Sequence, residues 1–224
     1  MYAAEAEGLL ALRAAGVRAP EPFDHGLRGG TAFIEMERLE LGAKPDWPAM
    51  GTMLAQLHRR TSDRFGWARD NWIGLAPQKN AFGEDWLAFF RDYRLRPQIE
   101  EARRNGYSVA LPPLALLERH RPQPSLVHGD LWRGNGGFTA EGPVIFDPAV
   151  YYADREVDLA MTELFGGFPA EFYSAYRAAY PLEPGYESRK VLYNLYHLLN
   201  HLNLFGAGYL AQVRAALRLL LDAL

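Results

Sequence analysis

The sequence contains no cysteine, which excludes a disulfide framework and any metal site built on thiolates. It also lacks a block of one charge, because its 24 basic and 27 acidic residues are scattered and leave a formal net charge of −3. This distribution argues against a nucleic-acid-binding surface. The first residues have neither the basic flank nor the apolar run of a signal peptide, and no stretch approaches membrane-spanning length. We therefore expect a cytoplasmic protein that binds neither a membrane nor nucleic acid.

Motifs that cradle phosphate groups are missing as well. The early glycines do not form a G-x-G-x-x-G loop, and no Walker A sequence occurs. Lysine is scarce, and the three that occur are Lys44, Lys79 and Lys190. None of them lies in a predicted strand ahead of the first helix. Phosphate binding by a glycine loop or by a strand lysine is therefore not supported by the sequence.

The hydrophobic share of 49% in 224 residues is sufficient for one large domain or two small ones. Helix-favouring residues over 2–15 are followed by Gly16, and alternating residues over 23–36 flank Gly29-Gly30, which predicts a helix and then a hairpin. Further on, apolar residues recur mainly at helical spacing, starting after the capping residue Asp46. We expect an α+β fold with a boundary near residue 38.

Two short apolar runs, Leu126-Val127 and Val144-Ile145-Phe146, enclose a loop rich in glycine and polar residues. They predict a small β-ribbon that presents side chains at its ends. The residues that could carry chemistry are concentrated in this segment.

The strongest motif is the run His128-Gly129-Asp130-Leu131-Trp132-Arg133-Gly134-Asn135, followed twelve residues later by Asp147. Phosphoryl transfer needs a carboxylate that orients and deprotonates the acceptor hydroxyl, and oxygen ligands for magnesium. In protein kinases an Asp stands five residues before an Asn, and a further Asp follows the next strand. Asp130, Asn135 and Asp147 keep this arrangement. Taken alone, His-Gly-Asp could be an ordinary turn, but the full set favours a kinase-like site.

The run 128–135 resembles the fructosamine (ketosamine) kinase branch of the aminoglycoside phosphotransferase-like superfamily. Segments similar to that family in order and spacing cover most of the chain: 71–74, 78–80, 85–90, 94–98, 146–149, 164–169 and 193–201. The resemblance implies a two-lobed, protein-kinase-like fold with a truncated amino-terminal lobe over 1–38 and a mainly helical lobe over 39–224. It also implies ATP-dependent phosphorylation of the 3-hydroxyl of a ketosamine, free or attached to a protein, as a deglycation repair.

The same resemblance assigns roles to individual residues. Asp130 would be the catalytic base, and Asn135 and Asp147 would bind Mg²⁺ beside ATP. Trp132 and His128 would contact the substrate. The aromatic ring of Trp132 can cover the apolar face of a sugar, and the alternative for this residue is a core tryptophan.

Three further residues are assigned to the nucleotide by the resemblance. Glu5 would take the place of the glutamate that pairs with the ATP-binding lysine, although its position in a first helical turn is also typical of a solvated surface residue. Met36 and Arg38 would belong to a hinge that contacts adenine. The missing lysine departs from the family pattern.

Other acceptors remain open, because the same constellation would serve an aminoglycoside, choline or homoserine kinase. An inactive, kinase-like binding protein is a third hypothesis. We expect a monomer, or a dimer formed through the unpaired edge of the 31–36 strand. Asp158 is expected to orient the catalytic loop or to cap a helix. His197 and His201, four residues apart, are more typical of a polar helix face lining the acceptor pocket than of a metal site.

Overall fold

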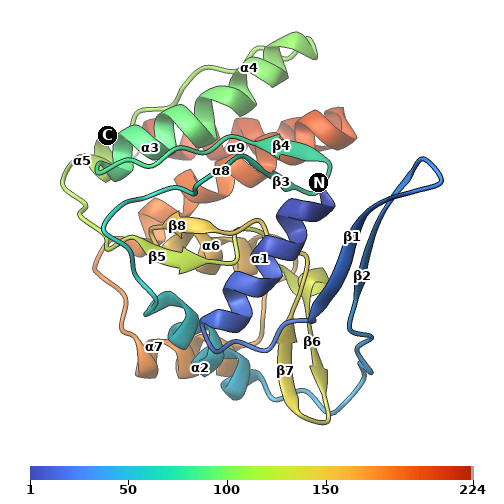
Figure 1. Cartoon of the computed structure of the whole chain (residues 1–224). Helices are drawn as coiled ribbons and strands as arrows, with labels where there is room; N and C mark the ends of the chain where they lie inside the picture. Colours follow the sequence, from blue (N-terminus) through green and yellow to red (C-terminus); the bar gives the residue numbers. More distant parts are fainter. Residues whose placement is uncertain (223–224) are drawn as a thin grey trace.

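The computed structural model describes residues 1–222 (Figure 1). Its α-helices are α1 Tyr2–Ala14, α2 Trp47–His58, α3 Trp86–Phe90, α4 Arg96–Arg104, α5 Ala115–Glu118, α6 Glu156–Leu164, α7 Ala170–Ala179, α8 Tyr186–Phe205 and α9 Leu210–Asp222. A π-helical turn, η1, spans Arg91–Leu95, and 3₁₀ turns are η2 Arg133–Asn135 and η3 Ala207–Tyr209. The strands are β1 Pro22–Arg28, β2 Thr31–Met36, β3 Asn71–Ile73, β4 Ala76–Gln78, β5 Ser125–Val127, β6 Gly136–Thr139, β7 Gly142–Ile145 and β8 Tyr151–Ala153.

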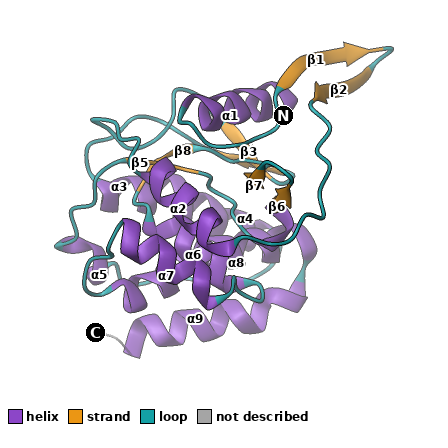
Figure 2. Ribbon diagram, turned by 90° about the horizontal axis from the view of Figure 1, so that it is seen from below, coloured by secondary structure: helices purple, strands orange, loops and turns teal. Residues whose placement is uncertain are grey.

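Helices form the body of the molecule, and short antiparallel ribbons lie on one side of it. Figure 2 shows α2, α6, α7, α8 and α9 together, with α1 and the β1–β2 hairpin on the opposite side. The expected α+β class is therefore confirmed. No helix in the described part of the chain is long and apolar enough to span a membrane.

Helix α1 is anchored in the same core as the helical body. Leu9 and Leu12 are fully buried, in one hydrophobic cluster with Leu54 and Leu57 of α2. Burying such side chains contributes roughly 1.5–3 kcal/mol each. The segment predicted as a separate unit over 1–38 thus shares its core with residues of the helical region, and α1 is held firmly where it can carry site residues.

The hairpin predicted over 23–36 is present and projects from the body (Figure 1). Arg28 pairs with Thr31 across Gly29 and Gly30. The positive φ angles of these glycines, 58° and 82°, suit a two-residue hairpin turn. Within the described residues, β1 and β2 hydrogen-bond only to each other. A dimer through this edge stays a prediction.

The prediction that residues 126–127 and 144–146 pair in one β-ribbon is wrong. β5 pairs with β8, Val127 opposite Tyr151, whereas β7 pairs with β6 in a separate hairpin. The reason lies in the chain after β7, where Asp147 has a φ of 55° and reverses the chain so that β8, not β7, reaches β5. The two ribbons therefore bracket the catalytic loop from both sides.

Helix starts follow the sequence signals. The Asp46 carboxylate accepts a hydrogen bond from the Ala49 N–H at 3.0 Å, and the Asp85 carboxylate accepts one from the Ala88 N–H at 2.7 Å. Both are N-caps. The β3–β4 hairpin was not predicted, because each strand has only three residues.

Candidate active site

The start of the loop 128–135 is held by the side chain of Asp158 in α6. The buried Asp158 carboxylate accepts hydrogen bonds from the backbone N–H groups of His128 at 2.7 Å and Gly129 at 2.8 Å. Burial alone would raise the pKa of Asp158, but the hydrogen bond and charge of His58 and the backbone hydrogen bond from Gly129 lower it. Asp158 is thus an ionised anchor, and its predicted role in orienting the loop is confirmed.

Both glycines of the loop are required by close contacts. Gly129 has a φ of 84°, and a Cβ there would lie 2.2 Å from the carbonyl oxygen of Ala149. A Cβ on Gly134 would lie 2.3 Å from the ring of Trp132. The loop therefore packs against the segment after Asp147, and the indole lies directly over Gly134.

His128 lies in the protein interior and not in the pocket described below. Its Nε2 donates to the carbonyl of Phe146 at 2.9 Å, and its Nδ1 accepts the N–H of Asp130 at 3.3 Å. Burial lowers its pKa, so the ring is neutral and both nitrogens are engaged. This placement does not favour the predicted contact with substrate and makes His128 a support for the Asp130 backbone.

Asp130 and Asn135 meet as the spacing predicts. The Asn135 Nδ2 donates to the Asp130 carbonyl at 2.9 Å and to its carboxylate at 3.3 Å. This leaves the Asn135 Oδ1 without a hydrogen-bond donor among the described residues. Burial, followed by the negative charges of Asp158 and Asp147, raises the pKa of Asp130 to about 7. A carboxylate with a pKa near neutrality is suited to accept a proton.

Asp147 is the only described non-glycine residue with positive φ, at 55°. Asp tolerates this region, yet such backbone strain is concentrated at functional sites. Glu5 of α1 lies beside it: burial, and then the charge of Asp147, raise the pKa of Glu5 to about 6. Glu5 is half-buried here, so the reading as a solvated surface residue is not supported.

These residues line one cavity of about 380 Å³ that we call the Asp130 pocket. Its lining consists of Met1, Ala4, Glu5, Asn71, Trp72, Gly74, Leu75, Asp130, Trp132, Asn135, Asp147, Pro148, Asn200, His201, Leu204 and Phe205. Trp132 is 39% exposed, which rules out the core-tryptophan alternative. The lining contains three carboxylates and neither lysine nor arginine, so the pocket is suited to cationic groups.

The oxygen donors of this pocket fit a hard divalent cation. Asn135 offers a free Oδ1, and Asp147 and Glu5 offer adjacent carboxylates whose repulsion a cation would relieve. The residues suited to hold Mg²⁺ are therefore Asn135 and Asp147, with Glu5 beside them.

The predicted hinge residues lie outside the Asp130 pocket. Met36 is partly buried against the core, and the Arg38 side chain is 87% exposed and pairs with Glu40 at 3.2 Å. None of the three lysines lines the pocket: Lys79 pairs with Asp70, Lys190 pairs with Glu163 and Glu187, and Lys44 is exposed.

Two polar residues of α8 line the pocket with fixed hydrogen-bonding directions. Asn203 Nδ2 must be a donor, because it lies 2.9 Å from the Gln98 carbonyl oxygen, and it therefore also donates to Gln98 Oε1 at 2.8 Å. This fixes the Gln98 amide, whose Nε2 donates to Asn200 Oδ1 at 3.2 Å. Asn200 therefore keeps its Nδ2 as a donor without an acceptor among residues 1–222. The His201 Nδ1 donates to the His197 carbonyl at 2.8 Å, and burial lowers the pKa of His201, so Nε2 is an acceptor.

The sequence pointed to His201 as part of a helix face at the acceptor pocket, and the structure confirms that placement. His197, one turn earlier, is fully buried instead. Asn200 was missed. The only signal was its membership of the segment 193–201, because an asparagine in the middle of a helix does not reveal which way it faces.

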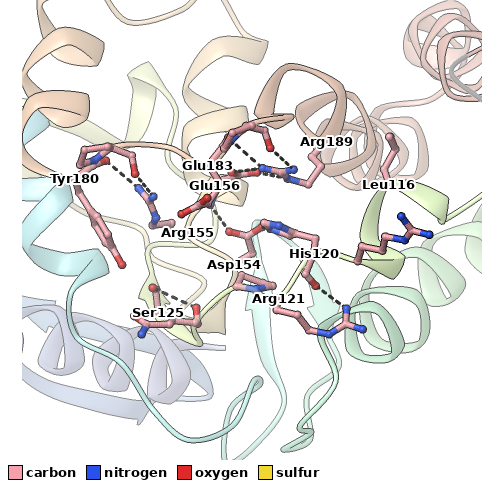
Figure 3. Close-up of a pocket in the computed structure, with 15 residues that line it drawn as sticks. Leu116, His120, Arg121, Ser125, Asp154, Arg155, Glu156, Tyr180, Glu183 and Arg189 are labelled. Carbon is pink, nitrogen blue, oxygen red and sulfur yellow. Dashed lines mark hydrogen bonds and ion pairs between the residues drawn. The ribbon is translucent and has the colours of Figure 1, made fainter.

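A second cavity, of about 660 Å³, lies elsewhere and is shown in Figure 3. In this His120 pocket the ligand-type atoms of His120, Asp154 and Glu156 lie within 4.8 Å of one another. Protein donors already occupy them: Asp154 accepts from His120 at 2.7 Å and from Tyr193 at 2.6 Å, and Glu156 receives two bonds of 2.7 Å from Arg189. We interpret this cluster as a closed ion network. No spacing in the sequence indicates this network.

The catalytic loop, the oxygen-donor set and the helical body define a kinase-like phosphotransferase. A choline/ethanolamine kinase family protein from Mesorhizobium loti shares this fold, with a TM-score of 0.59 and 18% identity over 97% of this chain and 76% of that chain. At this identity the likeness concerns the fold alone, and it supports the kinase-like expectation.

The family model described as fructosamine kinase matches residues 1–223, and the chain belongs to this family. A protein named "Probable ketoamine kinase" from Synechocystis is 49% identical over 97% of this chain and 78% of its own length. A crystal structure assigned to the fructosamine-3-kinases, from Haemophilus somnus, has a TM-score of 0.89 and 30% identity over 99% of this chain and 79% of that chain. The protein is thus an ATP-dependent small-molecule kinase.

Proposed function

We propose that this protein phosphorylates the 3-hydroxyl of ketosamines with Mg²⁺-ATP and acts in the repair of glycated amines. The observation that carries the proposal is that Asp130, Asn135, Asp147 and Trp132 meet in one pocket of about 380 Å³. The names of the similar proteins, ketoamine kinase and fructosamine-3-kinase, support the acceptor and the position.

The anionic lining supports a ketosamine over a neutral sugar. A ketosamine carries a protonated secondary amine, and the pocket presents the carboxylates of Glu5, Asp130 and Asp147 without a lysine or arginine in its lining. Trp132 offers an exposed ring against the apolar face of the sugar. Asn200 Nδ2 would donate to a carbonyl or hydroxyl oxygen, and His201 Nε2 would accept from a hydroxyl or from the amine.

In the proposed reaction Asp130 accepts the proton of the sugar O3–H. The new bond joins O3 to the γ-phosphorus, and the bond between that phosphorus and the β–γ bridging oxygen breaks, which releases ADP. A bound magnesium ion would neutralise charge on the phosphates, and Asn135 and Asp147 are the residues suited to hold it. Asn135 also holds the Asp130 carboxylate in place, and His128 and Asp158 fix the backbone of the loop.

The proposal is tested by incubating the chain with Mg²⁺-ATP and a set of acceptors, namely a fructosyl-amine, choline and an aminoglycoside. Product would be detected by mass spectrometry and the phosphate position by NMR. We expect 3-phosphate on the fructosyl-amine alone, and a loss of about 10²–10⁴-fold in Asp130→Asn, the usual contribution of a general base. Transfer to choline or to the aminoglycoside only would identify another hydroxyl kinase. Absence of transfer together with intact ketosamine binding would identify a binding protein.

A further inference from the structure

Arg94 is the largest fully buried side chain of the described structure, and the reaction proposed above does not use it. It lies on the π-helical turn η1, and its guanidinium stacks on Tyr151 at 3.8 Å and on Phe89 at 4.8 Å. It donates only to carbonyl and amide oxygens among the described residues, and its Nε has no partner. A buried cation that no described carboxylate contacts through a hydrogen bond is costly, so a purely structural role would be met better by an apolar residue.

The hydrogen bonds that start at Arg94 have only one possible direction. Arg94 Nη2 donates to Asn80 Oδ1 at 2.8 Å. Because a guanidinium has donors and no acceptor, the Asn80 amide must turn its Nδ2 the other way. That Nδ2 donates to Asn71 Oδ1 at 2.9 Å. The orientation of Asn71 is thereby fixed in turn.

The chain ends on the backbone that follows Asp147. Asn71 Nδ2 donates to the carbonyl of Val150 at 2.8 Å. Gln78 forms a parallel branch: its Nε2 donates to Asn71 Oδ1 at 2.8 Å and to the Ala149 carbonyl at 3.1 Å. The network begins at the Arg94 guanidinium, which only donates, and ends at the Ala149 and Val150 carbonyls, which only accept. No side-chain amide between them can therefore flip without losing a hydrogen bond.

The two carbonyls belong to the turn that presents Asp147. Asp147 has a φ of 55°, a conformation that persists only where the surroundings impose it. On its other side the turn is held by the Ala149 N–H, which donates to the His128 carbonyl at 2.8 Å. The network from Arg94 therefore holds one side of the turn and the catalytic loop holds the other.

We propose that Arg94 is a positioning residue that acts through Asn80 and Asn71 to fix the Asp147 turn in its metal-binding conformation. This inference rests on the proposed role of Asp147 as a ligand of Mg²⁺.

The decisive variant is Asn80→Asp. It keeps an acceptor for Arg94 and brings a carboxylate into contact with the guanidinium. It removes the Asn80 donor to Asn71 and to the Arg69 and Gln78 carbonyls, and leaves Gln78 Nε2 as the remaining donor to Asn71 Oδ1. We expect an unchanged or higher melting temperature, about a tenfold or greater rise in the Mg²⁺ concentration for half-maximal rate, as is typical of residues behind metal ligands, and faster amide hydrogen exchange over 147–151. Unchanged metal dependence or unchanged exchange would overturn the proposal.

A second test replaces the arginine itself in Arg94→Lys, with Arg155→Lys as the matched control. Arg155 is also a buried arginine stacked on a tyrosine, Tyr180 at 3.7 Å, and it donates to Tyr176 and to backbone carbonyls. We expect both variants to lower the melting temperature and only Arg94→Lys to shift the metal dependence and the exchange over 147–151. Equal shifts in both would contradict the inference. Hydrogen exchange needs no substrate, so it decides the inference even if no ketosamine is phosphorylated.

Discussion

The two cavities contain similar residue types and use them in opposite ways. In the His120 pocket each buried carboxylate has a partner: Asp154 is held by His120 and Tyr193, and Glu156 by Arg189. The lining of the Asp130 pocket places no lysine or arginine beside its carboxylates, and the pKa of Asp130 is raised to about 7. Paired charges stabilise the junction of α6 and α8, whereas unpaired charges remain available for a proton, a metal ion and a cationic acceptor.

The largest effect that separates the two pockets is expected for Arg189→Met. Removal of the arginine leaves Glu156 buried without a partner, which should lower the free energy of unfolding by about 3–5 kcal/mol. Urea unfolding measures this loss. The kcat of the remaining folded protein should not change, because Arg189 lies away from the Asp130 pocket. The double variant Glu156→Gln, Arg189→Met should recover much of the stability, and a large loss of kcat in the single variant would show that the pockets are coupled.

The next effect is the pH dependence of the reaction. Because a base must be ionised to accept a proton, and because the pKa of Asp130 is about 7, kcat/KM should fall as the pH falls through 7, approaching about tenfold per pH unit below it. Rates measured between pH 5 and 9 in matched ionic strength check this. A profile that is flat down to pH 5 would mean that Asp130 keeps the ordinary pKa of an exposed aspartate.

A smaller effect is expected for Trp132→Leu. The indole is 39% exposed and lies over Gly134, so its removal should leave the melting temperature unchanged and raise KM for the ketosamine. A stacking contribution of about 0.5–1.5 kcal/mol corresponds to a roughly 2- to 13-fold rise. Steady-state kinetics with Trp132→Phe as the conservative control test this. A lowered kcat with unchanged KM would assign the ring to the chemical step.

Local chemistry made much of the site predictable. The five-residue interval between Asp130 and Asn135 and the strand before Asp147 predicted that the three would meet, since metal and base requirements fix both residue type and spacing. The cap at Asp46 and the turn at Gly29-Gly30 were predictable as well, because local hydrogen bonding and backbone conformation select the residue type at such positions.

Long-range pairing was not predictable in the same way. The apolar runs at 126–127 and 144–146 looked like partners, but the positive φ of Asp147 sends β8 to β5 instead. Arg94 was visible in the sequence only as the first residue of the family-like segment 94–98, and its burial depends on a π-helical turn that periodicity does not reveal. The partners in the His120 network are 33 to 39 residues apart, so no local spacing signals them.

The most direct test of the account is the transfer of the γ-phosphoryl group to a fructosyl-amine by the wild-type chain and by Asp130→Asn at pH 8, with unfolding followed in parallel. Because the folded-state pKa of Asp130 is raised, ionisation of this residue opposes folding above pH 7, and the variant should be at least as stable as the wild type. We predict transfer by the wild type and its loss in a stable variant. Equal transfer by both proteins, or none by either, would contradict the assignment of Asp130 as the base of a ketosamine kinase.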